Sequence, residues 1–262
     1  MSASALITNL VPSQNLTQPL LRKQRRLTPR AAASIEAQIV TSPTQREIVY
    51  KMRHDSYVAQ GFLSPKTSGL FADLFDQSPN SHSVLIFRDG EPVASVRASI
   101  LDLYGQIPDA TEIPATSSYG EEIVKLVSGY EGHGVKGRAI EMTRLVTRHD
   151  LSFDFDLVFS LFRMTFYIVN HYDADMILSG VRLHHTPFYR RLGFEKITEP
   201  RNYPMLNFQV CLMACPDHMY GHVARTVPII DHVSKHDAVC APFMAGERVR
   251  VFSQMPGVQV AA

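Results

Sequence analysis

Charged residues in this sequence lie within apolar segments, where ionic side chains are rare. The clearest case is the segment Ile140–Val146, which has the pattern of a buried strand and carries both Glu141 and Arg144. Removing water from an unpaired charge costs several kcal/mol or forces a pKa shift, so such charges must be paired. Carboxylates act as general bases and guanidinium groups bind carboxylates, so the pattern predicts an assembled polar site. The residues concerned are Arg53, Asp73, Asp76, Arg97, Glu141 and Arg144.

Composition narrows the class of protein. The 262 residues are 45% hydrophobic, enough for one large domain, or one domain with extensions, built on a single core. A formal net charge of +1 gives no reason to expect nucleic acid as a partner. The three cysteines show no metal-ligand spacing, and their odd number fits a reducing cytoplasm. No apolar run approaches the roughly 18 residues of a transmembrane segment.

Three regions are predicted along the chain: a basic N-terminal segment at 1–35, a main domain at 36–215 and a C-terminal extension at 216–262. The first region has no acidic residue before Glu36 and contains a cluster of arginines and lysine. Transit peptides have this composition, and so do solvated basic tails. A third use of the cluster would be to steer an acidic protein partner.

Hydrophobic patterning and turn signals indicate the elements that must position the charged residues. Strands are predicted at 37–41, 83–87, 92–100, 138–148, 175–181, 194–197 and 208–214, and helices at 42–61, 121–128, 155–172, 186–192 and 217–235, before a loose tail. A loop at 63–82 separates the first helix from a hairpin that turns at Asp89-Gly90. This order predicts an α/β (α+β) fold with a single mixed central sheet flanked by helices.

Two motif sets resemble known acyltransferases. The run FYRRLGF at 188–194 resembles the late signature of the GNAT acyltransferases. An upstream set is similar to the autoinducer synthases that make acyl-homoserine lactones, over roughly residues 45–215. Together they imply a GNAT-like fold and an amide-forming acyltransferase. The upstream set consists of Arg53, Tyr57, Phe62, the pair Asp73-x-x-Asp76, Arg97 and the motif Glu141-x-Thr143-Arg144.

Departures from those synthases point to a second branch of the resemblance. They carry Trp where this chain has Phe62, they follow the hairpin arginine with a different segment from the one after Arg97, and they are shorter. The long-chain N-acyl amino acid synthases share the core and acylate an amino acid from an acyl-carrier-protein thioester. This branch is the first hypothesis. A lactone synthase that uses S-adenosylmethionine is the second, and a non-catalytic GNAT-like binding module is the third.

The segment 148–153 bears on the acyl donor. GNAT acetyltransferases bind the coenzyme A pyrophosphate on a glycine-rich turn at a helix N-terminus. This segment has no glycine, and Asp150, Asp154 and Asp156 lie where the pyrophosphate would bind. The pattern favours the phosphopantetheine arm of acyl-carrier protein as donor, with no permanently bound cofactor and no metal. Residues available to contact this small acidic partner are Arg22, Lys23, Arg25, Arg26, Arg30, Arg46, Lys51, Arg148, Arg190 and Arg191.

Glu141 is the first candidate for the base that deprotonates the acceptor amine, and the alternative is a buried ion pair with Arg144. In a regular strand Glu141 and Thr143 share one face, and only a bulge would bring Arg144 to that face. Arg97 and Arg144 are candidates to bind a substrate carboxylate, or else they form an internal network with the acidic residues.

The remaining candidates follow from the resemblance. It implies an acceptor site and N-terminal lid built with Arg53, Asp73 and Asp76, and Tyr189 as the acid that protonates the departing thiol. The alternatives are a purely structural role for Arg53 and Asp73, and a Tyr189 packed between helix and sheet. Backbone N–H groups near residues 145–147 would stabilise the oxyanion, and the helix at 155–172 would leave room for a fatty acyl chain. His184 and His185 are interpreted as a helix cap or surface feature. The substrate-binding candidates are Arg53, Phe62, Asp73, Asp76, Thr143, Leu145 and Val146.

Overall fold

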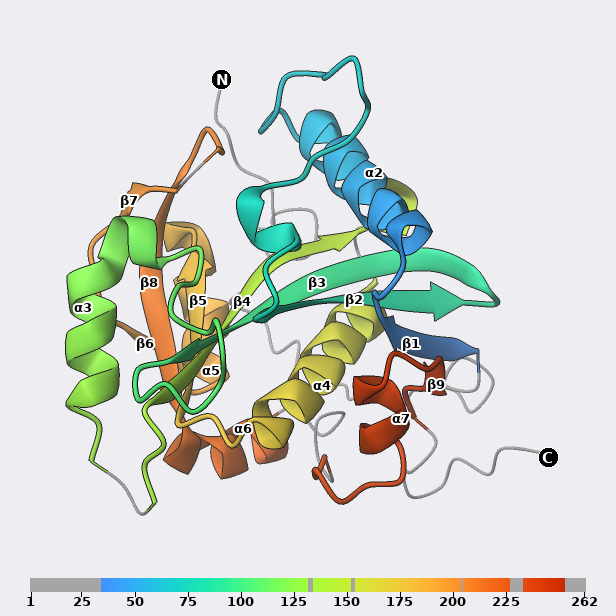
Figure 1. Cartoon of the computed structure of the whole chain (residues 1–262). Coiled ribbons are helices and arrows are strands. Elements are labelled where there is room, and N and C mark those ends of the chain that lie inside the picture. Colours follow the sequence, from blue (N-terminus) through green and yellow to red (C-terminus); the bar gives the residue numbers. More distant parts are fainter. Residues whose placement is uncertain (1–33, 132–133, 152–153, 204, 227–232, 253–262) are drawn as a thin grey trace.

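A nine-stranded mixed sheet forms the centre of the protein (Figure 1). The computed structural model describes residues 34–131, 134–151, 154–203, 205–226 and 233–252. Strands follow the order β6-β8-β5-β4-β3-β2-β1-β9, with β7 paired to β8, so the predicted single mixed sheet is confirmed. The strands are β1 Ile35–Ile39, β2 Ser81–Arg88, β3 Glu91–Asp102, β4 Arg138–Thr147, β5 Met176–Val181, β6 Glu195–Lys196, β7 Arg201–Asn202, β8 Gln209–Pro216 and β9 Val249–Arg250.

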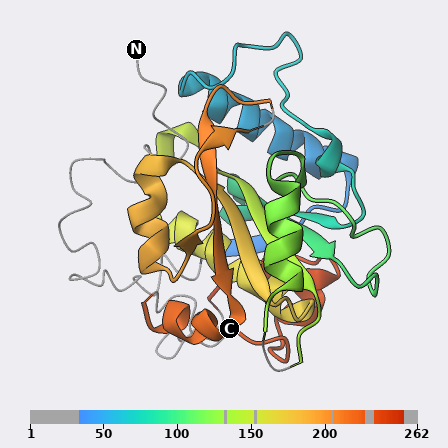
Figure 2. The ribbon, with the colours of Figure 1, turned by 90° about the vertical axis from the view of Figure 1, so that its left-hand side faces the viewer.

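Helices cover both faces of the sheet. The helices α2 and α3 contribute to one hydrophobic cluster, and α4, α5 and α7 contribute to the cluster on the other face. Figures 1 and 2 show α2 and α4 on opposite sides of the strands, and likewise α3 and α5. The helices are α2 Pro43–Ala59, α3 Thr116–Ser128, α4 Phe155–His171, α5 Thr186–Arg191, α6 Tyr220–Thr226 and α7 Cys240–Met244, with short 3₁₀ helices at Leu74–Asp76, His149–Leu151, Leu183–His185 and Asp217–Met219.

The helix α2 begins at a strong local signal. The Ser42 side chain accepts a hydrogen bond from the Gln45 N–H, and the Gln45 side chain accepts one from the Ser42 N–H, while Pro43 occupies the first turn. This capping box satisfies N–H groups that have no partner inside the helix. The helix holds Arg53 and Tyr57 on its buried face toward the sheet.

Two features of the central strands create space for a site. The pairing of β3 with β4 shifts register at Ser95–Arg97, and Arg144 within β4 has a φ of 54°. This is a bulge, which adds a residue to one strand and redirects its side chains. On the other side, β4 pairs with β5 only from Ala139 to Glu141. Beyond Glu141 the two strands are not paired, so the sheet is split there.

The C-terminal region differs from the prediction. The helix expected over 217–235 is wrong in its extent, because the described residues at its expected end, 233–235, are not helical. The expected loose tail is also wrong for residues 240–252: β9 pairs with β1, and Arg163 of α4 donates a hydrogen bond to the Val251 carbonyl at 2.9 Å. Such short segments carry no readable period, and contacts distant in sequence order them. The basic cluster at 22–30 lies outside the described residues.

Within the described part of the chain, no helix has both the length and the apolar character needed to cross a membrane. The same residues hold no group of three or more His, Cys, Asp or Glu side chains placed to bind a metal ion.

Candidate active site

Asp73 is the centre of a buried ionic network. Its carboxylate accepts hydrogen bonds from Arg97 of β3 (Nη1 to Oδ1, 2.6 Å) and from Arg144 of β4 (Nη2 to Oδ2, 2.7 Å). Burial alone would raise the pKa of Asp73, but the hydrogen bonds and charges of these two guanidinium groups hold its pKa far below the usual range. Asp73 is therefore ionised and joins two strands to the loop that carries it.

Asp76 extends the network to the first helix. Its Oδ1 accepts from Arg53 of α2 at 2.5 Å and from Arg97 at 2.8 Å. Asp73 also caps the 3₁₀ helix that contains Asp76, which fixes both carboxylates in one turn of the loop. The internal network considered from the sequence is thus the arrangement observed. Three guanidinium groups face two carboxylates, so the cluster keeps a positive charge.

The bulge in β4 explains how consecutive residues reach the same cluster. Arg97 donates from Nε to the Thr143 hydroxyl at 3.4 Å, while Arg144 binds Asp73. Without the positive φ at Arg144, these neighbours would point to opposite faces of the sheet. The bulge that would be needed to bring Arg144 to the same face as Thr143 is therefore present in β4.

Glu141 lies beside this network without a direct ion pair to it. Its side chain is 0% exposed; Oε2 accepts from the Ala115 N–H at 2.8 Å and Oε1 from the Tyr203 hydroxyl at 2.9 Å. Burial raises the pKa of Glu141 to about 7, partly opposed by these hydrogen bonds and by the nearby arginines. Arg144 pairs with Asp73 rather than with Glu141. A carboxyl group with this pKa can take up and release a proton near neutral pH.

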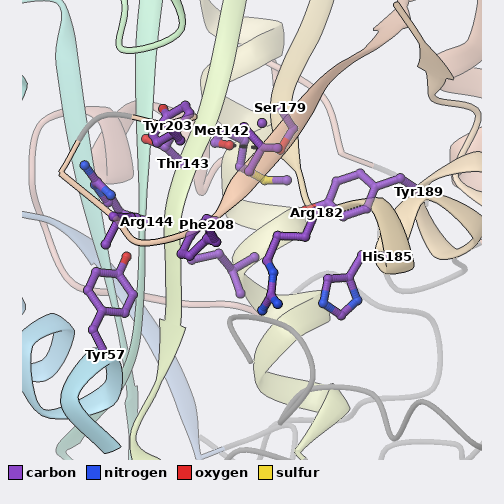
Figure 3. A pocket seen from close by; sticks show the side chains of 14 residues that line it. Tyr57, Met142, Thr143, Arg144, Ser179, Arg182, His185, Tyr189, Tyr203 and Phe208 are labelled. Carbon is purple, nitrogen blue, oxygen red and sulfur yellow. Dashed lines mark hydrogen bonds between the residues drawn. The ribbon is translucent and has the colours of Figure 1, made fainter. Parts of the chain in front are cut away.

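A pocket opens at the split between β4 and β5 (Figure 3). One side carries Tyr57 from α2, and the other carries Arg182, His185 and Tyr189 around the start of α5. The lining residues therefore include some from helices on both faces of the sheet. The lining residues are Tyr57, Met142, Thr143, Arg144, Leu145, Ser179, Gly180, Arg182, His185, Tyr189, Tyr203, Leu206, Phe208 and Val210.

Some of the site residues predicted from the sequence line the pocket, and the others do not. Thr143, Arg144, Leu145 and Tyr189 line the pocket. Burial raises the pKa of Tyr189 to about 12, so its phenol keeps its proton at neutral pH. The others lie outside the pocket lining: Glu141, Arg97, Arg53, Asp73, Asp76, Phe62 and Val146.

Sequence reasoning missed several residues of the wall, Tyr203 and Arg182 among them, and misinterpreted His185. Tyr203 follows a two-residue strand with no periodic signal, yet it connects the pocket to Glu141. Arg182 lies directly after β5, with its guanidinium carbon 5.1 Å from the ring centre of Phe62 and 5.2 Å from that of Phe208. His185 occupies the position before α5, but it is 1% exposed and makes no side-chain cap, so the cap or surface interpretation is wrong for this residue.

The N-terminus of α4 is occupied by the protein's own carboxylate. Asp154 accepts hydrogen bonds from the N–H groups of Asp156 and Leu157, and Arg88 donates to its other oxygen at 2.6 Å. Nearby, Arg148 forms a two-pronged pair with Asp150. A helix N-terminus that already binds a carboxylate has its anion-binding N–H groups in use.

Comparisons with known proteins agree with this geometry. The sequence model of a family described as N-acyl amino acid synthase FeeM matches residues 48–216. The solved structure of FeeM, an N-acyl amino acid synthase from uncultured soil microbes, is similar with a TM-score of 0.57 and 18% identity over 76% of this chain and 98% of that one. No curated protein matches the sequence significantly.

Two structures of acyl-homoserine lactone synthases are also similar. One is MesI, described as CoA-dependent, with a TM-score of 0.51 and 14% identity over 77% of this chain and 100% of that one. The other is LasI, with a TM-score of 0.50 and 14% identity over 74% and 93% of the two chains. At these identities the likeness shows the fold, which is the GNAT-like acyltransferase fold expected from the motifs.

Proposed function

Because the chain belongs to the N-acyl amino acid synthase family of FeeM, we propose that it transfers a long-chain fatty acyl group from an acyl-carrier-protein thioester to the α-amine of an amino acid. The family establishes an acyltransferase that makes N-acyl amino acids; the donor, the chain class and the residue roles are our proposal. The observation that carries it is the buried Glu141 carboxyl group, linked through Tyr203 to a pocket at the split in the sheet.

The first step is removal of a proton from the acceptor. Glu141 lies outside the pocket lining, whereas Tyr203 lines the pocket and its hydroxyl donates to the Glu141 carboxylate. The substrate ammonium gives a proton to the Tyr203 oxygen while the Tyr203 proton moves to Glu141. This relay leaves a neutral amine next to the thioester without exposing the carboxylate to water.

The second step is attack and release of the thiol. The amine nitrogen forms a bond to the thioester carbonyl carbon, and backbone N–H groups near Leu145 stabilise the oxyanion. The C–S bond then breaks, Tyr189 protonates the sulfur, and the amine nitrogen gives its second proton to the Tyr189 oxygen. The proton held by Glu141 passes to solvent, so both protons that the ammonium loses are accounted for. The arginine network, whose member Arg144 lines the pocket, holds β3, β4 and the 3₁₀ loop in place around this centre.

Apolar side chains from both faces of the sheet support a fatty acyl group as the transferred unit. Met142 and Leu145 of β4 line the pocket together with Leu206 and Val210. Each methylene buried against such a wall contributes about 0.8 kcal/mol.

The α4 N-terminus supports a carrier-protein donor over free coenzyme A. A pyrophosphate there would meet the Asp154 carboxylate, which already holds the helix N–H groups. An unfavourable contact of about 1.4 kcal/mol is a factor of ten in affinity. We therefore expect kcat/KM for acyl-carrier protein to exceed that for the matching acyl-coenzyme A by about tenfold or more in steady-state assays. Equal use of both donors would contradict the carrier-protein proposal.

The surface for the carrier protein is best placed on α5, next to Tyr189. Lys51 and Arg148, two other candidates, are paired with Asp55 and Asp150, whereas Arg190 is exposed on α5 beside the pocket. We expect Arg190→Glu to raise KM for acyl-carrier protein severalfold and to leave kinetics with an acyl-pantetheine unchanged, because rim charges act on encounter with the partner.

Lys125→Glu is the matched control for this docking surface. Lys125 is exposed on α3, which lies on the opposite face of the sheet from α5 (Figure 2). Its reversal should leave KM for acyl-carrier protein unchanged. A change of the same size in both variants would indicate a general charge effect and contradict docking on α5.

Product analysis tests the function directly. Purified protein, acyl-carrier protein loaded with a fatty acid, and a mixture of amino acids should yield N-acyl amino acids detectable by mass spectrometry. Addition of S-adenosylmethionine should yield neither acyl-homoserine lactone nor methylthioadenosine. Lactone formation would favour the autoinducer synthase alternative, and no product with any donor would favour a binding module.

We also place this reaction in the cytoplasm. Cys211, Cys215 and Cys240 are free and buried, which fits a compartment that keeps thiols reduced.

A further inference from the structure

Arg182 is a buried cation in the wall of the pocket. It follows β5 directly, is 7% exposed, and lies over the rings of Phe62 and Phe208 at 5.1 and 5.2 Å. Burial lowers the pKa of Arg182 to about 10, so the guanidinium stays charged at neutral pH. The two rings hold the stem and head of the side chain against the pocket, which reduces the conformational freedom lost when a ligand binds.

His185 lies beside Arg182 in the same wall (Figure 3). Its side chain is 1% exposed, and neither Nδ1 nor Nε2 has a hydrogen-bond partner among the residues that the structure describes. Buried polar groups are nearly always hydrogen-bonded, so an exception in a pocket indicates a ligand that completes it. Burial, with the charge of Arg182 nearby, lowers the pKa of His185 to about 3, so the ring is neutral and offers one N–H.

This pair lies close to the proposed relay. Phe208 contacts Arg182, and its carbonyl accepts a hydrogen bond from the Tyr203 N–H at 3.4 Å. An amino acid bound with its carboxylate at Arg182 therefore extends along Phe208 toward Tyr203, which is where the ammonium must lose its proton.

We propose that Arg182 and His185 form the subsite for the α-carboxylate of the acceptor amino acid. A guanidinium fork matches a carboxylate through two parallel hydrogen bonds, and the neutral imidazole adds an N–H donor to the same group. This inference rests on the proposed function and adds to it a selection rule: the acceptor must keep a free carboxylate. Amines without a carboxylate and amino acid esters are excluded by the loss of these hydrogen bonds.

The test compares an amino acid with its methyl ester as acceptors at a fixed donor concentration. Wild-type protein should prefer the free acid by about ten- to a hundredfold in kcat/KM, the range expected for charge-assisted hydrogen bonds. In Arg182→Met, kcat/KM for the free acid should fall by that factor because its KM rises. The kinetic constants for the ester should not change, so the variant uses both acceptors equally well. His185→Phe keeps the ring volume and should give a smaller loss in the same direction.

Controls come from exposed side chains away from the pocket. Arg225→Met and His236→Phe change the same residue types outside the pocket lining and should retain the preference for the free acid. Arg182→Lys keeps the charge but loses the fork, and should fall between wild type and Arg182→Met. Unchanged discrimination in folded Arg182→Met protein, checked by circular dichroism, would overturn the subsite.

A second series distinguishes the carboxylate from a phosphate on the donor arm. Acyl-phosphopantetheine and acyl-pantetheine are compared as donors with wild type and Arg182→Met. Equal effects of the variant on both donors support the carboxylate assignment, and an effect only on the phosphorylated donor overturns it. If wild type forms no N-acyl amino acid, the proposed function fails, and thermal stabilisation by the amino acid but not by its ester still tests the subsite separately.

Discussion

Glu141→Gln should lower kcat by about 10²- to 10⁴-fold with little change in KM for either substrate, the range that general base catalysis supplies. Gln preserves the size of the side chain but cannot accept the proton that Tyr203 passes on. Steady-state kinetics with a carrier-bound acyl donor measures the effect. A loss below about threefold would show that Glu141 is not the base.

The pH profile gives an independent readout of the same carboxyl group. With a pKa of about 7, Glu141 is increasingly protonated as the pH falls below neutrality, so kcat should fall on the acid side of pH 7. The Gln variant should lack this limb. The folded-state pKa of Glu141 lies above its usual 4.5, so its protonated form favours folding, and this contribution is lost as pH rises through about 7.

Tyr203→Phe tests the relay separately from the base. It removes the hydroxyl that donates to Glu141 and leaves the ring and the Ala115 hydrogen bond in place. We expect kcat to fall by the same order as in Glu141→Gln. Because the two groups act as a unit, combining both substitutions should lower kcat no further than the more harmful single substitution does. Tyr119→Phe removes another buried phenol hydroxyl, bonded to Val210, and should leave kcat near wild type. Additive losses in the double variant would contradict the relay.

Asp73→Asn should destabilise the folded state by about 3 to 5 kcal/mol, because it leaves the guanidinium of Arg144 without its countercharge and that of Arg97 with Asp76 alone. Both arginines are almost fully buried. Urea unfolding followed by circular dichroism measures the loss as a lower midpoint. Activity should fall as well, since Arg144 lines the pocket.

Asp55→Asn is the matched control for the ionic network. Asp55 is paired with Lys51 across one turn of α2, where both side chains are exposed, and such pairs contribute about 0 to 1 kcal/mol. Equal destabilisation by Asp55→Asn and Asp73→Asn would contradict a special role for the buried network.

The lowered pKa of Asp73 predicts that the protein loses stability in acid. Because this pKa is lowered from 3.8 in the folded state, the stabilising contribution of the carboxylate is present above pH 3.8 and is lost as the pH falls below that value.

The sequence alone determined that a polar site had to exist and which residue types would form it. Arg53, Asp73, Asp76 and Arg97 lie in segments too apolar for isolated charges, so their pairing followed from the cost of desolvation. Strand and helix periods likewise predicted the mixed sheet, since each long element must bury one face. The family followed from the same motifs and is confirmed by the match over residues 48–216.

Only the tertiary structure decided which charges meet and where the pocket opens. Arg144 reaches Asp73 because its own backbone in β4 adopts a left-handed conformation, which an arginine at that position does not predict. Tyr203 reaches Glu141 from a loop that β8 brings alongside the split in the sheet. Such contacts join residues far apart in the chain, and they arise from strand register and packing. Local patterns carry no information about either, so the proton relay and the carboxylate subsite became visible only in three dimensions.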